Sequence, residues 1–397
     1  MRRMLPKLCA VFLCSVVAGA GVVRADDSSA VATKKDLLDM KQQLNDLKAQ
    51  VDQGRLGDTE FLATGNLSAG FIAPENGDSN FSTTFSPILL WKISDQLMVE
   101  SEVEFELEDS DTATKLEYAQ INYSPSDYFT IVAGKFLTPI NVFVERYEPK
   151  WINKLPDTPL AVYDGILPES HVGAQIRGAA PIDEMKVNYA LFVGNGARLN
   201  TGEEDAGSLN FENFSDTNGN KSFGGRLGFL PLPNVEVGYG FEVGKAGDPE
   251  GAVEDASYNL HSLDFDYALD TAEIGGRFDV RLQYAWSNVD SGTYDADGSL
   301  GFGPATFSND RDGGYVQVSY RPSRMDQPVL TDLEFLVRYD RINNPSDAPQ
   351  STDENRTTLG VDYWLESATV FKLAYEIDDQ SGGQNNNAFL AQVATGF

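Results

Sequence analysis

The sequence predicts an all-β fold, an antiparallel transmembrane β-barrel of about 16 strands preceded by a short N-terminal coiled-coil helix. From Thr59 onward, segments of about 10–14 residues alternate apolar and polar side chains, which is the period of a strand with two different faces. Tight turns and long loops alternate between these segments, as they do in up-and-down barrels. The last segment, 387–397, ends the chain on an aromatic residue, Phe397.

Residues 1–25 are predicted to be a secretory signal peptide. Arg2, Arg3 and Lys7 precede an apolar run at 8–23, and a small residue follows Arg24. This is the order of the basic, apolar and cleavage regions of such a peptide. A retained membrane anchor is the alternative, but the run is short and ends at Arg24.

The composition excludes several classes of protein. Both cysteines, Cys9 and Cys14, lie in the signal segment, so we expect no thiol, disulfide, cysteine-bound metal or cofactor in the exported chain. Without the four basic residues of that segment, 26 basic residues face 60 acidic ones, a net charge of −34. We expect no nucleic-acid partner for such a chain. No later segment approaches the roughly 20 apolar residues of a spanning helix, so any membrane crossing must use strands.

Residues 26–57 are predicted to be a polar tether and a periplasmic helix. After a capping-box-like start at 33–36, apolar residues recur at steps of three and four over about two heptads, as in a coiled coil. These predicted oligomerisation residues are Leu37, Met40, Leu44, Leu47 and Val51. A lone amphipathic helix lying on the barrel would show the same pattern. We favour a three-stranded coiled coil in an oligomer held together elsewhere, because so short a helix is not stable alone.

The barrel domain is predicted at 58–397. Its expected strands are 60–72, 82–94, 96–108, 113–124, 127–137, 171–180, 183–194, 221–230, 234–245, 257–268, 272–287, 313–322, 332–342, 355–365, 368–378 and 387–397. An even number of strands puts both termini on the side of the short turns, which is the periplasmic side in bacterial barrels. The connection at 322–332 is longer than its place in this alternation predicts.

The polar face of the strands distinguishes a membrane barrel from a soluble one. Segment 96–108 carries four glutamates on one face, and four carboxylates cannot lie in a dry interior without partners. They can line water while the apolar face contacts lipid. We therefore predict a wide, water-filled lumen lined by Glu100, Glu102, Glu104, Glu106, Arg177, Lys186, Arg226, Arg277, Asp279, Arg281, Arg338 and Lys372.

The connection at 138–170 is the longest and too apolar to extend into water, since it contains Ile140, Val142, Phe143, Trp151, Ile152, Leu155 and Leu160. We predict that it folds into the lumen and narrows the pore. Its charged residues would then form the constriction, namely Arg146, Glu148, Lys150, Lys154 and Asp157.

Three stretches carry a resemblance to a known family. Ala133-Gly-Lys-Phe-Leu-Thr-Pro139, Glu145-Arg-Tyr147 and Trp151-Ile-Asn-Lys-Leu-Pro-Asp157 resemble the phosphate-selective porin O/P-type group of the bacterial outer-membrane porins. The resemblance extends over nearly the whole mature chain. It implies a trimeric, sixteen-stranded porin in the outer-membrane lipid of a Gram-negative bacterium, with basic residues attracting anions at the third loop. In such a barrel, Phe397 is the expected signal for the outer-membrane assembly machinery.

One feature departs from that family. Acidic side chains outnumber basic ones on the predicted inner wall, so phosphate selectivity is not carried over. We predict a passive diffusion channel for small hydrophilic or ionic solutes, in which facing acidic and basic walls orient dipolar solutes and set ionic preference.

Other functions remain open. The barrel could instead be a scaffold that sheathes or anchors a periplasmic partner protein. We expect no enzyme, because the two histidines, His171 and His261, lie on different strands without a serine elbow or a metal-spaced cluster. The acidic stretches 203–205 and 290–297 could bind calcium, but they lack the EF-hand positions, so we expect solvated loops.

Overall fold

The computed structural model describes residues 55–397, apart from gaps at 57–58, 109–110, 164, 201–205, 248–252, 254–255, 296–297, 299–300, 349–350 and 383–384. The predicted signal peptide and the predicted coiled-coil residues therefore lie outside the described residues.

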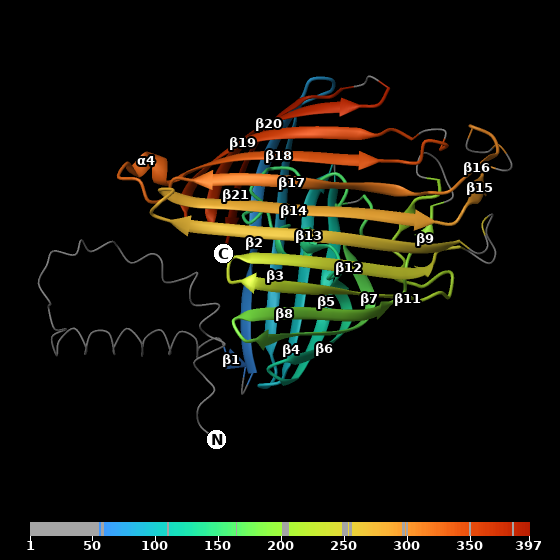
Figure 1. Ribbon diagram of the computed structural model, residues 1–397, viewed down its shortest axis with the longest axis horizontal. Helices are drawn as coiled ribbons and strands as arrows, with labels where there is room; N and C mark the ends of the chain where they lie inside the picture. The colour runs from blue at the N-terminus through green and yellow to red at the C-terminus, as the bar shows by residue number, and fades with distance from the viewer. Residues whose placement is uncertain are drawn as a thin grey trace, which may run out of the picture.

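Sixteen antiparallel strands form a closed barrel (Figure 1). Each pairs with its neighbours in chain order, and β2 pairs with β21 to close the circle. The sixteen-stranded antiparallel barrel is confirmed, and every predicted strand matches an observed one to within four residues. The strands are β2 (Thr59–Pro74), β3 (Asn80–Lys92), β4 (Leu97–Glu108), β5 (Asp111–Ser126), β6 (Phe129–Leu137), β7 (Ser170–Ile182), β8 (Met185–Gly194), β11 (Ser222–Leu232), β12 (Val235–Lys245), β13 (Ser257–Thr271), β14 (Gly276–Val289), β17 (Arg311–Arg321), β18 (Leu333–Asn343), β19 (Glu354–Glu366), β20 (Thr369–Gln380) and β21 (Ala388–Gly396).

Several short elements lie outside the barrel wall. β1 (Arg55–Leu56) pairs with the start of β2. Two hairpins lie in long connections, β9 (Arg198–Leu199) with β10 (Leu209–Asn210), and β15 (Gly292–Tyr294) with β16 (Ala305–Phe307). The helix α3 (Val142–Arg146) lies in the longest loop. The connection at 322–332 is longer than a tight turn because it contains the helix α4 (Pro328–Thr331).

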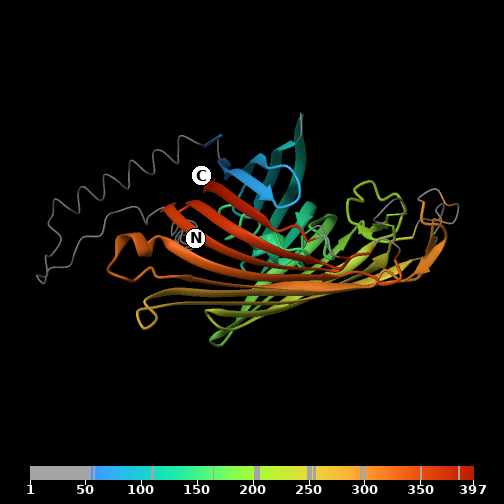
Figure 2. The ribbon, with the colours of Figure 1, turned by 90° about the horizontal axis from the view of Figure 1, so that it is seen from above.

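The two ends of the barrel differ. Long connections lie at one end, here called the loop end, where the β15–β16 hairpin projects (Figure 1). Short turns, α4 and the end of β21 lie at the other, the turn end. Seen from above, β2–β5 form one wall and β12, β13, β14 and β17 form the opposite one (Figure 2). Strand β5 thus faces β14 and β17 across the lumen.

The outer face of the wall is apolar and the inner face is polar. Along β14, Leu282 and Tyr284 are exposed on the outside, whereas Asp279 and Gln283 are buried inside. Leu263 and Val337 continue the outer apolar face on other strands. A soluble barrel would show the opposite arrangement. Among the described residues, no helix combines the length and the apolar character needed to cross a membrane.

The last residue completes the closure of the barrel. The Phe397 backbone N–H donates to the Gly65 carbonyl at 3.1 Å, and the Gly65 N–H donates to the Phe397 carbonyl at 3.2 Å. The Phe397 ring stacks on the outward ring of Phe85, with 6.0 Å between centroids. The terminal aromatic therefore lies at the seam, on the apolar outer surface at the turn end.

Replacing Phe397 by alanine removes this ring but keeps the backbone hydrogen bonds. If the ring is an assembly signal, the Phe397→Ala chain will reach the membrane as folded barrel in much lower yield. The refolded protein will lose only about 1 kcal/mol, the scale of one aromatic pair. Heat-modifiable gel migration measures the folded fraction in cells, and urea unfolding measures the free energy of unfolding.

The matched control is Phe389→Ala, an outward phenylalanine on β21, the strand that Phe397 directly follows, with a similar exposure, 42% against 56%. Equal folded yields for the two variants in cells would show that the last ring has no special role in assembly.

Candidate functional site: a loop folded across the barrel

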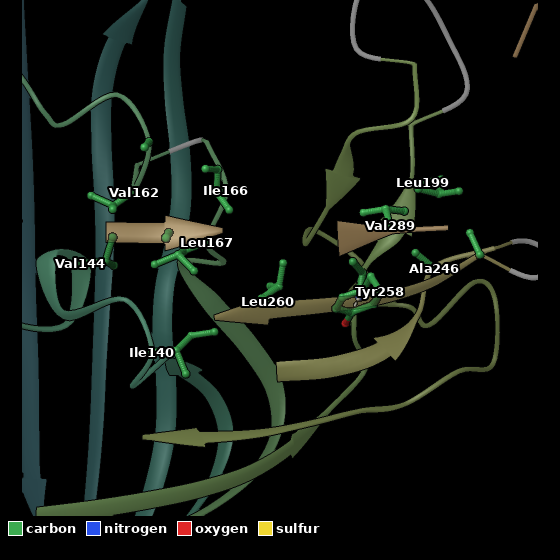
Figure 3. Close-up of a cluster of buried hydrophobic side chains, with 14 of the residues drawn as sticks. Ile140, Val144, Val162, Ile166, Leu167, Leu199, Ala246, Tyr258, Leu260 and Val289 are labelled. Carbon is green, nitrogen blue, oxygen red and sulfur yellow. Dashed lines mark hydrogen bonds between the residues drawn. The ribbon is translucent and has the colours of Figure 1, made fainter. Parts of the chain in front are cut away.

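The connection between β6 and β7, residues 138–169, crosses the inside of the barrel and is called the inner loop below. Its base is closed by the Thr138 N–H, which donates to the Glu169 carbonyl at 2.9 Å. Its apolar side chains lie against inward residues of the wall, as Figure 3 shows for Ile140 beside Leu260 of β13. The apolar residues of the loop are thus buried in the lumen.

The start of the inner loop is held by polar side chains of the opposite wall. The carbonyl of Ile140 accepts hydrogen bonds from Ser262 Oγ at 2.8 Å and Gln283 Nε2 at 3.0 Å. The Phe143 N–H at the start of α3 donates to Gln283 Oε1 at 3.1 Å. These bonds satisfy backbone groups that would otherwise be unpaired in a buried loop.

Inward-facing glycines make room for the loop. At four positions of the wall, a Cβ atom would come within 3.0 Å of a side chain of the inner loop, which is closer than side chains approach. The pairs are Gly240 with Ile140, Gly313 with Ala161, Gly360 with Leu155, and Gly396 with Trp151. The small residues of the wall therefore mark where the loop lies.

Lys154 anchors the middle of the inner loop to the opposite wall. Its ammonium lies 3.1 Å from Asp279 Oδ2 of β14 and 2.6 Å from Glu334 Oε1 of β18. It also donates to Ser319 Oγ of β17 at 2.6 Å. Because all of these groups are buried, each depends on the others to offset the cost of desolvation.

Asp157 forms a second anchor. Its carboxylate contacts Arg338 of β18 and lies 2.8 Å from Nη2 of Arg356 of β19. Burial raises the pKa of Asp157, but the guanidinium groups of Arg338 and Arg356 outweigh it and hold that pKa below its usual value. Asp157 is therefore ionised at neutral pH and pairs with both arginines.

Lys372 of β20 binds the same region of the loop from the barrel wall. Its ammonium donates to the carbonyls of Lys150 and Asn153 in the inner loop and to Gln392 Oε1 at 3.0 Å. The three N–H donors of this ammonium thus provide hydrogen-bond partners for two backbone carbonyls of the loop just before Lys154.

The structure divides the predicted constriction residues into two groups. Arg146, Glu148 and Lys150 line a cavity beside the loop. The side chains of Lys154 and Asp157 are instead buried between the loop and the wall, in the contacts just described.

The predicted pore-lining residues all belong to the inner face of the wall, but their surroundings differ. Arg338 and Lys372 are fully buried under the loop. Arg226 and Asp279 are buried in ion pairs, with Arg226 Nε 2.9 Å from Asp264 Oδ2. The others on this face are Glu100, Glu102, Glu104, Glu106, Arg177, Lys186, Arg277 and Arg281.

A cavity of about 240 Å³ lies between the inner loop and β3–β5, and is called the constriction cavity below. The wall contributes Glu102, Glu104, Glu117 and Tyr118, and the loop contributes Glu145, Arg146, Glu148 and Lys150. A smaller cavity of about 170 Å³ shares Tyr118 and Glu145 with it and adds Glu100, Gln120 and Arg177. Six carboxyl groups and three cationic side chains line the two cavities together.

Glu117 is a cavity residue that strict alternation does not predict, because β5 is not regular. Glu102 pairs with Tyr118 and Val103 pairs with Leu116, so the register shifts and Glu117 has no partner on β4. Such a bulge places two successive residues on one face. Glu117 and Tyr118 consequently both line the cavity, whereas strict alternation would have put them on opposite faces.

Glu148 is a titratable group of the loop in this cavity. Burial inside the barrel raises the pKa of Glu148 well above its usual value, and the carboxyl groups of Glu169 and Glu117 raise it further. The protonated form is thereby favoured, so the charge of the constriction cavity depends on pH.

The two histidines lie apart. His171 is buried at the loop end, with Nε2 3.0 Å from Glu242 Oε2. His261 lies on the outer face and stacks on Trp286 at 5.0 Å between centroids. Within the described residues, no three His, Cys, Asp or Glu side chains are arranged to hold a metal ion.

Solved structures of several bacterial outer-membrane proteins share this fold. The anion-selective porin of Comamonas acidovorans is 11% identical and covers 86% of this chain and 100% of its own, with a TM-score of 0.54. The outer-membrane channel DcaP of Acinetobacter baumannii is 10% identical over 87% and 99%, with a TM-score of 0.54. The trimer form of OmpT of Vibrio cholerae is 14% identical over 85% and 99%, with a TM-score of 0.53.

The sequence matches no protein-family model, and no curated protein matches it at a significant level. What the comparisons establish is the fold. The chain has the sixteen-stranded barrel of the bacterial outer-membrane porins.

Replacing Lys154 by methionine tests the anchor of the inner loop. Asp279 and Glu334 would be left buried without their ammonium partner, a loss of about 3–5 kcal/mol for a broken buried ion pair. We expect a lower free energy of unfolding in detergent and a larger, noisier single-channel conductance, because the released loop obstructs the lumen less. The control is Lys186→Met, which changes an exposed inner-face lysine at the turn end. An unchanged conductance in Lys154→Met would mean that this contact does not hold the loop.

Proposed function

We propose that this protein is a diffusion porin in the outer membrane of a Gram-negative bacterium, passing small hydrophilic or ionic solutes. The constriction cavity carries this proposal. It lies between a wall of carboxylates and a loop that is pinned to the opposite side of the barrel by Lys154 and Asp157. A charged passage beside a fixed loop excludes large solutes and selects small ones by charge.

The outside of the barrel supports a membrane location. Large apolar side chains are exposed over its whole circumference, among them Phe85, Ile121, Leu191, Leu263 and Leu373. Such a face suits lipid acyl chains and is unfavourable in water.

We further propose a homotrimer, inserted by the outer-membrane assembly machinery. Trimeric OmpT of Vibrio cholerae has the same fold, and the predicted coiled coil at 37–51 would join three chains on the turn side. Phe397 is the proposed signal for insertion.

The lining of the constriction cavity and of the smaller cavity beside it favours cations over anions once its carboxyl groups are ionised. Six carboxyl groups face three cationic side chains in the two cavities beside the loop. The cationic side chains are Arg146, Lys150 and Arg177, and two of them lie near Glu145, at 3.6 Å for Arg146 and 4.0 Å for Arg177. The resemblance to the phosphate-selective O/P-type group therefore supports a place among porins but not phosphate selectivity.

A planar-bilayer recording across a salt gradient tests the function and its selectivity together. We expect conductance steps in threes and a reversal potential that indicates cation preference. The double variant Glu102→Gln, Glu104→Gln removes two carboxyl groups of the wall and should shift the reversal potential toward anions, whereas Lys150→Glu should shift it toward cations. The control Glu184→Gln changes an acidic residue in the turn between β7 and β8 and should leave the reversal potential unchanged.

A barrel that sheathes a periplasmic partner is the competing hypothesis. Such a barrel would conduct poorly when purified alone.

The selectivity should also depend on pH. Since the pKa of Glu148 is raised, this carboxyl group is neutral below that pKa and becomes negative as the pH rises through it. Cation preference should therefore increase with pH, and Glu148→Gln should flatten this increase. A reversal potential with the same pH dependence in both proteins would assign the titration to other groups.

A further inference from the structure

A third cavity, of about 260 Å³, lies at the loop end and is called the mouth cavity below. Its charged lining consists of Lys115, Lys135 and Arg311 together with Glu169 and Glu212. Amide and hydroxyl side chains and the ring of Phe214 complete it. At less than the ~300 Å³ that begins the range of drug-sized sites, it suits a small metabolite.

Lys135 is the unusual member of this lining. Only 8% of the residue is exposed, its ammonium donates to the Leu116 carbonyl, and it lies 4.5 Å from the centroid of the Phe214 ring. Glu169 and Glu212 line the same cavity, but among the described residues no carboxylate lies within ion-pair distance of the Lys135 ammonium. A buried ammonium that lacks a close counter-ion is costly, and it becomes favourable when an anionic group binds beside it. The mouth cavity therefore offers a place for a carboxylate.

Lys115 connects the mouth cavity to the constriction cavity. Its ammonium lies 2.6 Å from Glu169 Oε2, which lines the mouth, and 3.4 Å from Glu117 Oε1, which lines the constriction. Beyond Glu117, the wall continues with Glu104 and Glu102. The carboxylates of the constriction cavity thus lie beyond Lys115, on its side away from the mouth.

The order of these charges selects among solutes. A simple anion is attracted by Lys135 but then meets the excess of carboxylates at the constriction. A simple cation is attracted by that excess but repelled by Lys135. A small molecule with a carboxylate at one end and an ammonium at the other is complementary to both cavities.

We propose that the mouth cavity is a binding subsite for small zwitterions of the amino-acid class. Lys135 holds the carboxylate, and the ammonium points toward Glu117 and the acidic wall. This inference rests on the proposed porin function and adds a solute class and a binding position to it.

The test measures how three matched solutes, added on the loop side, interrupt the ionic current of single channels. The probes are 4-aminobutyrate, butyrate and n-butylamine, which differ only in their charged ends. We expect 4-aminobutyrate to block at a concentration at least about tenfold lower than either of the others, the effect of one additional charge-assisted hydrogen bond. In Lys135→Gln, that advantage over n-butylamine should disappear, and Lys135→Arg should keep most of it.

The control variant is Lys221→Gln, which removes an exposed basic residue at the loop end that pairs with Asp216. It should leave the block by all three probes unchanged. The proposal is overturned if butyrate blocks as well as 4-aminobutyrate, if n-butylamine does so, or if Lys135→Gln leaves the block unaltered. Current through the channel without any preference for the zwitterion would refute this inference alone, whereas absence of current would refute the porin function itself.

Discussion

The ammonium of Lys154, buried between Asp279 and Glu334, fixes the inner loop to one side of the barrel, and the rest of the site depends on this contact. Asp157, paired with Arg338 and Arg356, extends the attachment along the same wall. Breaking one buried ion pair costs far more than forming it gains, since it leaves a charge without water or a partner. The loop is therefore held in one position rather than in several of similar energy.

The attachment leaves space on the other side of the loop. The loop contacts inward side chains of β13, β14 and β17–β20, and the constriction cavity lies opposite, against β3–β5. On that side, the wall supplies carboxylates and the loop supplies Arg146 and Lys150. Buried charges thus hold the loop, while partly exposed charges face the solute. The same residue types serve both purposes, and only their burial distinguishes them.

The strands were predictable from the sequence, because each face has its own environment and the chain repeats this contrast every second residue. The inner face of Glu100, Glu102 and Glu104 follows from the same alternation. The two extra hairpins were not predictable in this way, since β9–β10 and β15–β16 pair over only two or three residues each. The short helix α4 was visible only as a connection longer than expected.

Within the site, alternation identified the inner face but not which charges remain accessible on it. Lys150 and Lys154 are four residues apart in one loop, yet one lines the cavity and the other is buried against three strands. Glu117 was missed because a bulge changes the register within β5. The sequence does contain one local signal of the loop's path, the inward glycines that the loop contacts, such as Gly240 and Gly360.

By itself, the sequence determined the barrel, its number of strands, its polar interior and the aromatic end at Phe397. These follow from a pattern that is local along the chain and independent of what lies across the lumen. Only the tertiary structure decided the path of the inner loop and the pairing of Lys154 and Asp157 with the far wall. Those depend on distances between residues more than a hundred positions apart, which the sequence does not express as a pattern.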